Sequence, residues 1–131
     1  MKTEPSLHQA DFEAIGRVAV WTGSFTDELK ADDYMNLDRA FERDFGFRID
    51  DRNAPEMAVK PQPVPIRELV EGFSGWHDYA DAVVAAAEAA GIASASTMLV
   101  FHWMVFDPQR VSVNPNAPVR FLGNFEFEGF R

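Results

Sequence analysis

The chain has 131 residues, of which 47% are aliphatic or aromatic and 25% are charged. This length and composition match a single folded domain without room for two independent cores, and they exclude a disordered or fibrous chain. The 21 acidic residues outnumber the 12 basic ones, giving a net charge of −9 that repels phosphate backbones. Direct binding of nucleic acid is therefore not expected.

Membrane insertion and secretion are not expected either. The longest strongly apolar run, residues 98–106, is interrupted by His102 and is far shorter than the roughly 20 residues that span a bilayer. The N-terminus lacks the pattern of a signal peptide. Cysteine is absent, which excludes disulfides, thiolate metal sites and cysteine nucleophiles. We expect a cytoplasmic protein.

The first predicted elements are a strand and a helical region. The strand covers residues 17–21, which are rich in valine and precede a Thr-Gly-Ser break. Thr26 is the expected N-cap of the helical region, because acids follow it in the first turn. Apolar side chains then recur at helical spacing up to Gly46, which supplies a stop, and one broken helix or two short helices fit equally. The residues of this stripe are Tyr34, Leu37, Phe41 and Phe45.

Residues 50–65 contain four prolines and form the expected proline-rich loop. Proline cannot donate a backbone hydrogen bond, so this segment should be mostly extended or irregular, with room for an edge strand at residues 57–60. We expect it to be the most mobile loop of the protein.

The second half of the chain predicts a short helical turn at residues 66–71, then a longer helix and two strands. The longer helix is expected to be capped by Ser74 and to end at Gly91. Its apolar stripe consists of Trp76, Tyr79, Ala80, Val83, Val84 and Ala87. The strand at residues 97–106 is apolar on both faces and should be central, whereas residues 119–127 place three phenylalanines, Phe121, Phe125 and Phe127, on one face.

These elements predict an α+β fold. We expect a single domain over residues 1–131, with a mostly antiparallel sheet, helices packed mainly on one face, and an N-terminal extension at residues 1–16.

Two short motifs, W-T-G-S-F and F-L-G-N-F, share an aromatic residue, a glycine and a phenylalanine. Gly23 and Gly123 lie at or beside strands, where glycine permits a bulge or a close backbone approach. The four aromatic residues of the motifs are expected to form one core cluster: Trp21, Phe25, Phe121 and Phe125. The alternative that Trp21 or Phe25 anchors a partner stays open.

Catalytic and metal-binding motifs are not found. His8, His77 and His102 are too far apart for a helical zinc pair, and we interpret His102 as a hydrogen-bonded structural residue. The adjacent pair His77 and Asp78 points in different directions on a helix and does not suggest a catalytic dyad. No glycine-rich nucleotide motif occurs. We therefore expect no enzyme activity, no metal and no cofactor.

Residues 27–51 hold nine acids against four bases. One interpretation is a solvated helix face that keeps the protein soluble, and the other is a surface for a basic partner. Seven acids are candidate partner contacts, chosen for charge density alone: Asp32, Asp33, Asp38, Glu42, Asp44, Asp50 and Asp51.

Four segments together resemble the bacterial immunity protein 22 family: V-W-T-G-S-F, R-A-F-E-R-D-F-G-F, S-T-M-L-V-F-H-W and F-L-G-N-F-E-F. The resemblance covers residues 17–127. It implies an α+β fold and a protective role in a bacterial polymorphic toxin system, in which the protein binds and neutralises a toxin of its own cell or its kin, without catalysis. The chain departs from the family picture at residues 1–16 and 55–65.

Immunity by binding is thus the function that we expect. An acidic protein suits a basic, nuclease-type toxin domain, whose active site or a nearby exosite it would occlude. Two other classes of function stay open. A small-molecule or regulatory module would use a pocket between sheet and helices under residues 55–65. An enzyme would use an unfamiliar pair such as Glu126 with Asp78 or His77. The sequence does not predict the oligomeric state.

Overall fold

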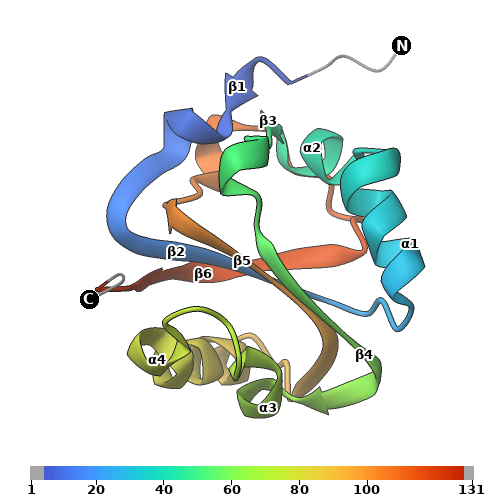
Figure 1. Cartoon of the computed structure of the whole chain (residues 1–131), viewed down its shortest axis with the longest axis vertical. Helices are drawn as coiled ribbons and strands as arrows, with labels where there is room; N and C mark the ends of the chain where they lie inside the picture. Colours follow the sequence, from blue (N-terminus) through green and yellow to red (C-terminus); the bar gives the residue numbers. More distant parts are fainter. Residues whose placement is uncertain (1–4, 129–131) are drawn as a thin grey trace.

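The computed structural model describes residues 5–128 (Figure 1). Residues 1–4, within the expected N-terminal extension, and residues 129–131 lie outside the described part. The strands are β1 (Leu7–His8), β2 (Glu13–Gly23), β3 (Phe47–Arg48), β4 (Glu56–Pro65), β5 (Ser94–Met104) and β6 (Val119–Glu126). The α-helices are α1 (Glu28–Asp32), α2 (Ala40–Phe45), α3 (Ile66–Val70) and α4 (Trp76–Ala89), and a π-helix covers Asp33–Leu37.

The main sheet is antiparallel, with the strand order β4-β5-β2-β6. A separate pair, β1 and β3, is parallel. The α+β class and the mostly antiparallel sheet are therefore confirmed, and the apolar strand β5 is central as predicted.

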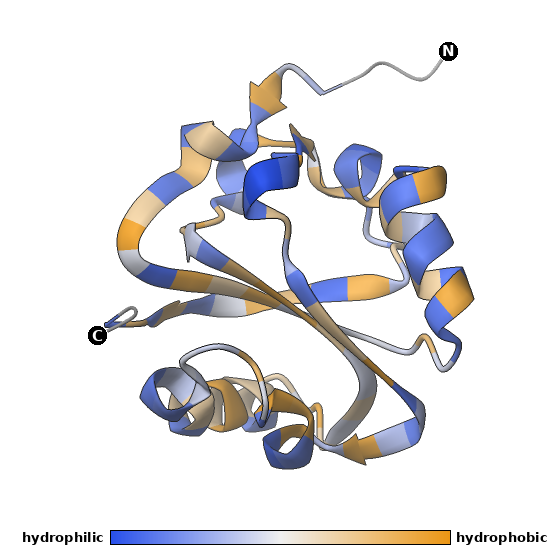
Figure 2. Cartoon of the chain, viewed as in Figure 1, coloured by the Kyte–Doolittle hydropathy of each residue, from blue (hydrophilic) through white to orange (hydrophobic). Residues whose placement is uncertain are grey.

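The helices are divided between the two faces of the sheet, rather than gathered mainly on one. Figure 1 shows α3 and α4 on one side, and α1, α2, β1 and β3 on the other. The reason is that the central strands are apolar on both faces, so each face must be covered. Val18 and Val20 of β2 pack in the cluster under α3 and α4, which we call the helical core, whereas Ala19 and Trp21 point into the opposite cluster, which we call the aromatic core. Figure 2 shows the apolar residues along the middle of β2 and β5.

Trp21 is the centre of the aromatic core. It is 0% exposed, so it cannot anchor a partner. The rings around it have centroids 4.8 to 6.4 Å from its own and come from Phe41, Phe45, Phe47, Phe101, Phe106 and Phe121. Offset and edge-on contacts of this kind add to the stabilisation that comes from burying the rings.

Residues 5–16 are an integral part of the fold, so the expected N-terminal extension is wrong for them. Leu7 of β1 pairs with Phe47 of β3, and Phe12 is 3% exposed in the aromatic core. The strand β2 begins at Glu13, four residues before the predicted start. The sequence pattern missed this because the register with β5 shifts between Glu13 and Val18, which breaks the alternation of apolar side chains.

The region between β2 and β3 forms three helical pieces instead of one or two. Asp27, not Thr26, is the N-cap of α1, and its carboxylate accepts a hydrogen bond from the backbone N–H of Leu29 at 2.8 Å. The predicted stop is confirmed, since Gly46 ends α2 with a φ of 79° in the left-handed region.

The proline-rich segment is more regular than expected, because β4 extends over ten residues to Pro65. It lies at the edge of the sheet, and among residues 5–128 it pairs only with β5. The register between these strands shifts between Val59 and Val64, so Pro61 and Pro63 fall where ladder hydrogen bonds are already interrupted. An edge strand tolerates prolines at such positions.

The short helical turn and the longer helix are both confirmed as α3 and α4, but Ser74 does not cap α4. The N-cap is Gly75, with a φ of 71° and no capping side chain. Ser74 instead contributes its backbone. Its N–H donates to Glu56 Oε1 at 2.9 Å, and its carbonyl accepts from Tyr79 Oη at 2.8 Å and from His102 Nε2 at 2.9 Å. His102 is thus a hydrogen-bonded residue, as interpreted from the sequence.

A β-bulge in β6 separates the phenylalanines that the sequence placed on one face. Val20 pairs with Gly123 but Trp21 pairs with Phe121, which leaves Leu122 as an extra residue. Phe121 therefore lies against Trp21 at 4.8 Å in the aromatic core, whereas Phe125 packs in the helical core together with Phe127. The predicted single cluster is wrong for Phe125, and Phe25 lies at the periphery, 5.4 Å from Tyr34.

The two motif glycines are positions of close approach, as expected. A Cβ atom at Gly23 would lie 2.6 Å from Val119 Cγ1, and one at Gly123 would lie 3.1 Å from Phe125 Cζ. Both motifs thus serve the packing of the sheet.

Candidate partner-binding surface

The seven candidate acids fall into two groups in the structure. Four are exposed: Asp32, Asp33, Asp38 and Asp51. The other three, Glu42, Asp44 and Asp50, are buried or half-buried and bind groups of the protein itself.

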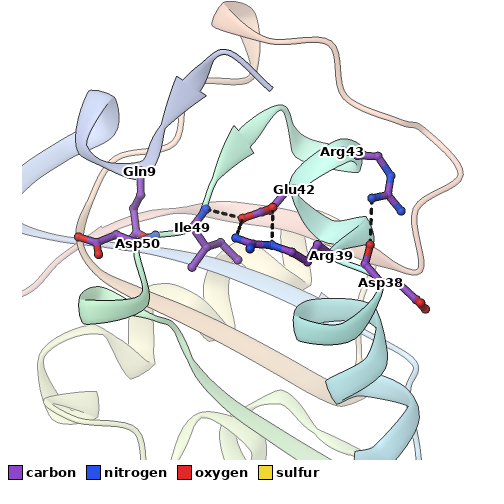
Figure 3. A network of polar contacts seen from close by, with 7 residues as sticks. All are labelled: Gln9, Asp38, Arg39, Glu42, Arg43, Ile49 and Asp50. Atoms are coloured by element: carbon purple, nitrogen blue, oxygen red, sulfur yellow. Dashed lines mark hydrogen bonds and ion pairs between the residues drawn. The ribbon is translucent and has the colours of Figure 1, made fainter. Parts of the chain in front are cut away.

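Glu42 is a structural residue, so its assignment as a partner contact is wrong. It is 2% exposed. Its carboxylate accepts hydrogen bonds from Arg39 Nε at 2.9 Å, Arg39 Nη2 at 2.7 Å and the backbone N–H of Ile49 at 2.8 Å (Figure 3). These bonds join the N-terminal end of α2 to the segment after β3. A buried carboxylate requires such partners, which explains why a charged residue is tolerated there.

Asp44 connects α2 to the π-helix and to the loop before β6 through its carboxylate. Its Oδ2 accepts from Tyr34 Oη at 2.7 Å and its Oδ1 accepts from Asn114 Nδ2 at 2.9 Å. Burial raises the pKa of Tyr34 well above its ordinary value, and the hydrogen bond to Asp44 and its negative charge raise that pKa further. Asp44 therefore has little capacity left for a partner.

Asp50 is likewise used locally, together with a residue that sequence reasoning missed. Its carboxylate accepts from the backbone N–H of Arg52 at 3.0 Å and from Asn53 Nδ2 at 3.1 Å. Its own N–H donates to Gln9 Oε1 at 2.9 Å (Figure 3), while Gln9 Nε2 donates to the carbonyl of Asn53 at 2.8 Å. Gln9 is 5% exposed, and a buried glutamine carries no recognisable signal in a segment interpreted as an extension.

The outward face of α1 and the π-helix carries two leucines. Leu29 and Leu37 are each 75% exposed, whereas Tyr34 and Met35 are buried beneath them. Leu37 was expected on the inner stripe, and the π-helix explains why it is not there. The backbone N–H of Asp38 donates to the carbonyl of Asp33 at 2.7 Å, which adds a residue to the turn and rotates Leu37 outward.

The exposed acids lie close to these leucines in the sequence. Glu28, Asp32, Asp33 and Asp38 lie on the same short stretch of chain, and Figure 2 shows it as mostly hydrophilic with apolar residues between. Asp32 Oδ1 accepts a hydrogen bond from Asn36 Nδ2 at 2.6 Å. We call this surface, residues 28–38, the leucine–acid face.

A small cavity lies beside the leucine–acid face, under the start of the proline-rich segment. It has a volume of about 90 Å³, and its lining includes Met35, Asn36, Asp51, Pro55 and Met57. Pockets for small organic ligands usually measure about 300 to 1,000 Å³, so this cavity is large enough for part of a partner's side chain but not for such a ligand.

The three residues considered for an alternative catalytic pair, His77, Asp78 and Glu126, have the following environments. The ring of His77 stacks on Trp76 at a centroid distance of 3.7 Å, and Asp78 Oδ2 accepts a hydrogen bond from the backbone N–H of Glu128 at 3.0 Å. Glu126 is exposed on β6.

Within residues 5–128, no group of three or more histidine or acidic side chains is arranged to hold a metal ion. In the same residues, no helix has the length and apolar character needed to cross a membrane.

Comparisons with protein-family models, with curated proteins and with solved structures found no match to this chain.

Proposed function

We propose that this protein is an immunity protein that binds a cognate bacterial toxin domain through the leucine–acid face and neutralises it. The observation that carries the proposal is the exposure of Leu29 and Leu37, at 75% each, among exposed carboxylates. Large apolar side chains surrounded by charges of one sign are typical of a protein-binding surface, because the apolar groups supply contact area and the charges select the partner. The sequence resemblance to an immunity family supports the same function.

The partner that suits this face is basic. The net charge of −9 attracts a positively charged domain at long range, and such steering raises association rates toward about 10⁸ to 10⁹ M⁻¹s⁻¹ at low salt. Toxins that cleave nucleic acids are basic where they contact phosphates, and carboxylates such as Asp32, Asp33 and Asp38 would occupy those contacts. The toxin would then be inhibited by occlusion of its active site or of an adjacent exosite.

The size of the protein is sufficient for a stable complex. Its accessible surface is 7532 Å², and a standard interface buries about 800 Å² on each partner, roughly a tenth of that surface. The leucine–acid face, together with Asp51 and Met57 beside it, extends over two neighbouring segments of the chain.

Co-expression tests the proposal directly. The toxin domain encoded beside this gene is expressed with or without the protein, and survival, co-purification and binding kinetics are measured at several salt concentrations. We expect rescue and a one-to-one complex whose association slows as salt rises. Cell death with nothing co-purifying would contradict this toxin pairing, and the same failure with every neighbouring toxin domain would contradict the proposed function.

Two sets of variants locate the surface. The triple change of Asp32, Asp33 and Asp38 to asparagine should lower the association rate and flatten its salt dependence, and Leu29→Ser with Leu37→Ser should raise the dissociation rate about tenfold or more. The matched control changes three exposed acids on the opposite side, Glu68→Gln, Asp81→Asn and Glu88→Gln, and removes the same net charge. Equal effects of both triple variants would place the binding site elsewhere.

A further inference from the structure

A groove at one end of the main sheet contains hydrogen-bond donors from three neighbouring strands. It has a volume of about 330 Å³ and lies where β2 ends and where β5 and β6 begin. Its lining includes Thr22, Ser96 and Arg120, with Pro63 and Ile92 among the apolar walls. None of the described residues that line the groove is acidic, although the whole chain has a net charge of −9.

Two of the donors, Thr22 and Arg120, lie on the same face of the sheet. Thr22 is paired with Arg120 on one side and with Met98 on the other. Paired residues of neighbouring strands share a face. Met98 belongs to the helical core, so Thr22 and Arg120 lie on the face of the sheet that α4 covers, and Ser96 lines the same groove from β5. Ile92, which follows α4, is part of the groove wall.

None of these donors has a partner among residues 5–128. Ser96 is 1% exposed, and its Oγ atom is buried without a hydrogen bond. Thr22 is 4% exposed, and no side-chain hydrogen bond from it occurs in the described part of the chain. Arg120 is exposed and forms no ion pair or hydrogen bond with the described residues. Buried polar groups are nearly always satisfied, so unpaired donors that share one groove indicate an acceptor that comes from outside.

We propose that this groove binds the oxyanion group of a small organic anion, either a carboxylate or a phosphate monoester. The guanidinium of Arg120 matches the geometry of an oxyanion and can donate two parallel hydrogen bonds to it. The hydroxyl of Thr22 adds a further donor, and the unpaired hydroxyl of Ser96, another lining residue, supplies a third. The apolar walls contact the body of the ligand, as in most small-molecule sites, whose volumes begin at about 300 Å³. This site is separate from the leucine–acid face and does not depend on the proposed immunity function.

The test uses the full chain and three aromatic probes of the same size class: phenyl phosphate, benzoate and phenol. Backbone amide signals are followed by NMR during titration at constant ionic strength. We expect saturable shifts at residues 22–24, 94–96 and 119–120 with phenyl phosphate, benzoate or both, and no saturable shift with phenol, which lacks the oxyanion. A response to phenyl phosphate alone assigns phosphate monoesters, and a response to benzoate alone assigns carboxylates.

Variants identify the cation that binds the probe. Arg120→Gln should weaken the affinity about tenfold or more, because a charge-assisted pair of hydrogen bonds is lost. The control is Arg17→Gln, which removes the same charge from an exposed position on β2 and should leave the affinity unchanged. If Arg120→Gln does not fold, Ser96→Ala takes its place, with an expected loss of about threefold or more. Absence of saturable binding by both anions, equal losses with Arg17→Gln and Arg120→Gln, or an unaltered Ser96→Ala would each overturn the proposal.

Discussion

Replacing Glu42 by alanine separates a role in folding from a role in binding. The side chain of Glu42 is 3% exposed and accepts three hydrogen bonds, two from Arg39 and one from the backbone of Ile49. Hydrogen bonds that involve a charged group contribute about 1.5 to 3 kcal/mol each. The side chain of Arg39 is 51% exposed and is hydrated when Glu42 is removed. Most of the free energy of its two hydrogen bonds to Glu42 is therefore recovered through hydrogen bonds to water. The half-buried N–H of Ile49 has no such compensation. We therefore expect Glu42→Ala to lower the free energy of unfolding by about 2 to 4 kcal/mol.

Urea unfolding, followed by tryptophan fluorescence, measures this change, and a thermal scan should show a melting temperature lower by about 10 °C. The matched control is Asp33→Ala, which removes an exposed acid nine residues earlier in the sequence and should change the stability by less than about 0.5 kcal/mol. Glu42→Gln should be intermediate, since an amide oxygen still accepts from Ile49. A Glu42→Ala protein as stable as the Asp33→Ala control would refute the structural role that we assign to this carboxylate.

Two further predictions concern the tyrosines and the glycines. The chain has two tyrosines, and burial, followed by nearby carboxylates, raises the pKa of both Tyr34 and Tyr79 above the ordinary value of about 10. The contribution of the two buried tyrosines to stability is therefore complete below about pH 10 and is lost as the pH rises above it. The absorbance of tyrosinate should appear only as the protein unfolds. A reversible titration of the tyrosines near pH 10 with the fold intact would contradict this prediction. Gly75 and Gly91 both have positive φ angles, but a Cβ at Gly75 would overlap the ring of Phe127, whereas a Cβ at Gly91 would have no atom of the described residues within 4 Å. We expect Gly91→Ala to cost about 1 kcal/mol and Gly75→Ala at least 2 kcal/mol more, measured by urea unfolding, and equal costs would show that backbone strain alone sets both.

Much of the fold follows from local patterns in the sequence. The long helix α4 has a continuous apolar stripe and a terminal glycine, and the central strand β5 is apolar on both faces, so both were predicted. The same property of β5 requires cover on both sides of the sheet. The prediction of helices mainly on one face did not take this requirement into account.

The errors arise where one residue is added to a regular pattern. The extra Leu122 in β6 moves Phe121 and Phe125 to opposite faces, and the extra residue in the π-helix turns Leu37 outward. A period of 2 or 3.6 cannot reveal such insertions, because each lies within a stretch that fits the regular period equally well. The exposed leucines of the candidate surface could therefore not be identified from spacing.

The acidic segment shows the same limit for function. Composition gives the charge of residues 27–51, but it does not distinguish an exposed carboxylate such as Asp33 from one such as Glu42, whose partners come from a neighbouring residue and from the backbone after β3. That distinction depends on tertiary contacts, which is why three of the seven candidates are structural and four remain available to a partner.

The separation of the two cores by the main sheet has a consequence for local opening of the protein. Side chains of β2 and β5 alternate between the helical core and the aromatic core, so either layer can detach while the sheet stays covered on its other side. Amide hydrogens in α1 and α4 can then exchange with solvent through separate openings, whereas those in the middle of β2 and β5 exchange only when both layers are lost. A partner on the leucine–acid face would slow exchange in α1 and the π-helix and leave exchange in α4 unchanged.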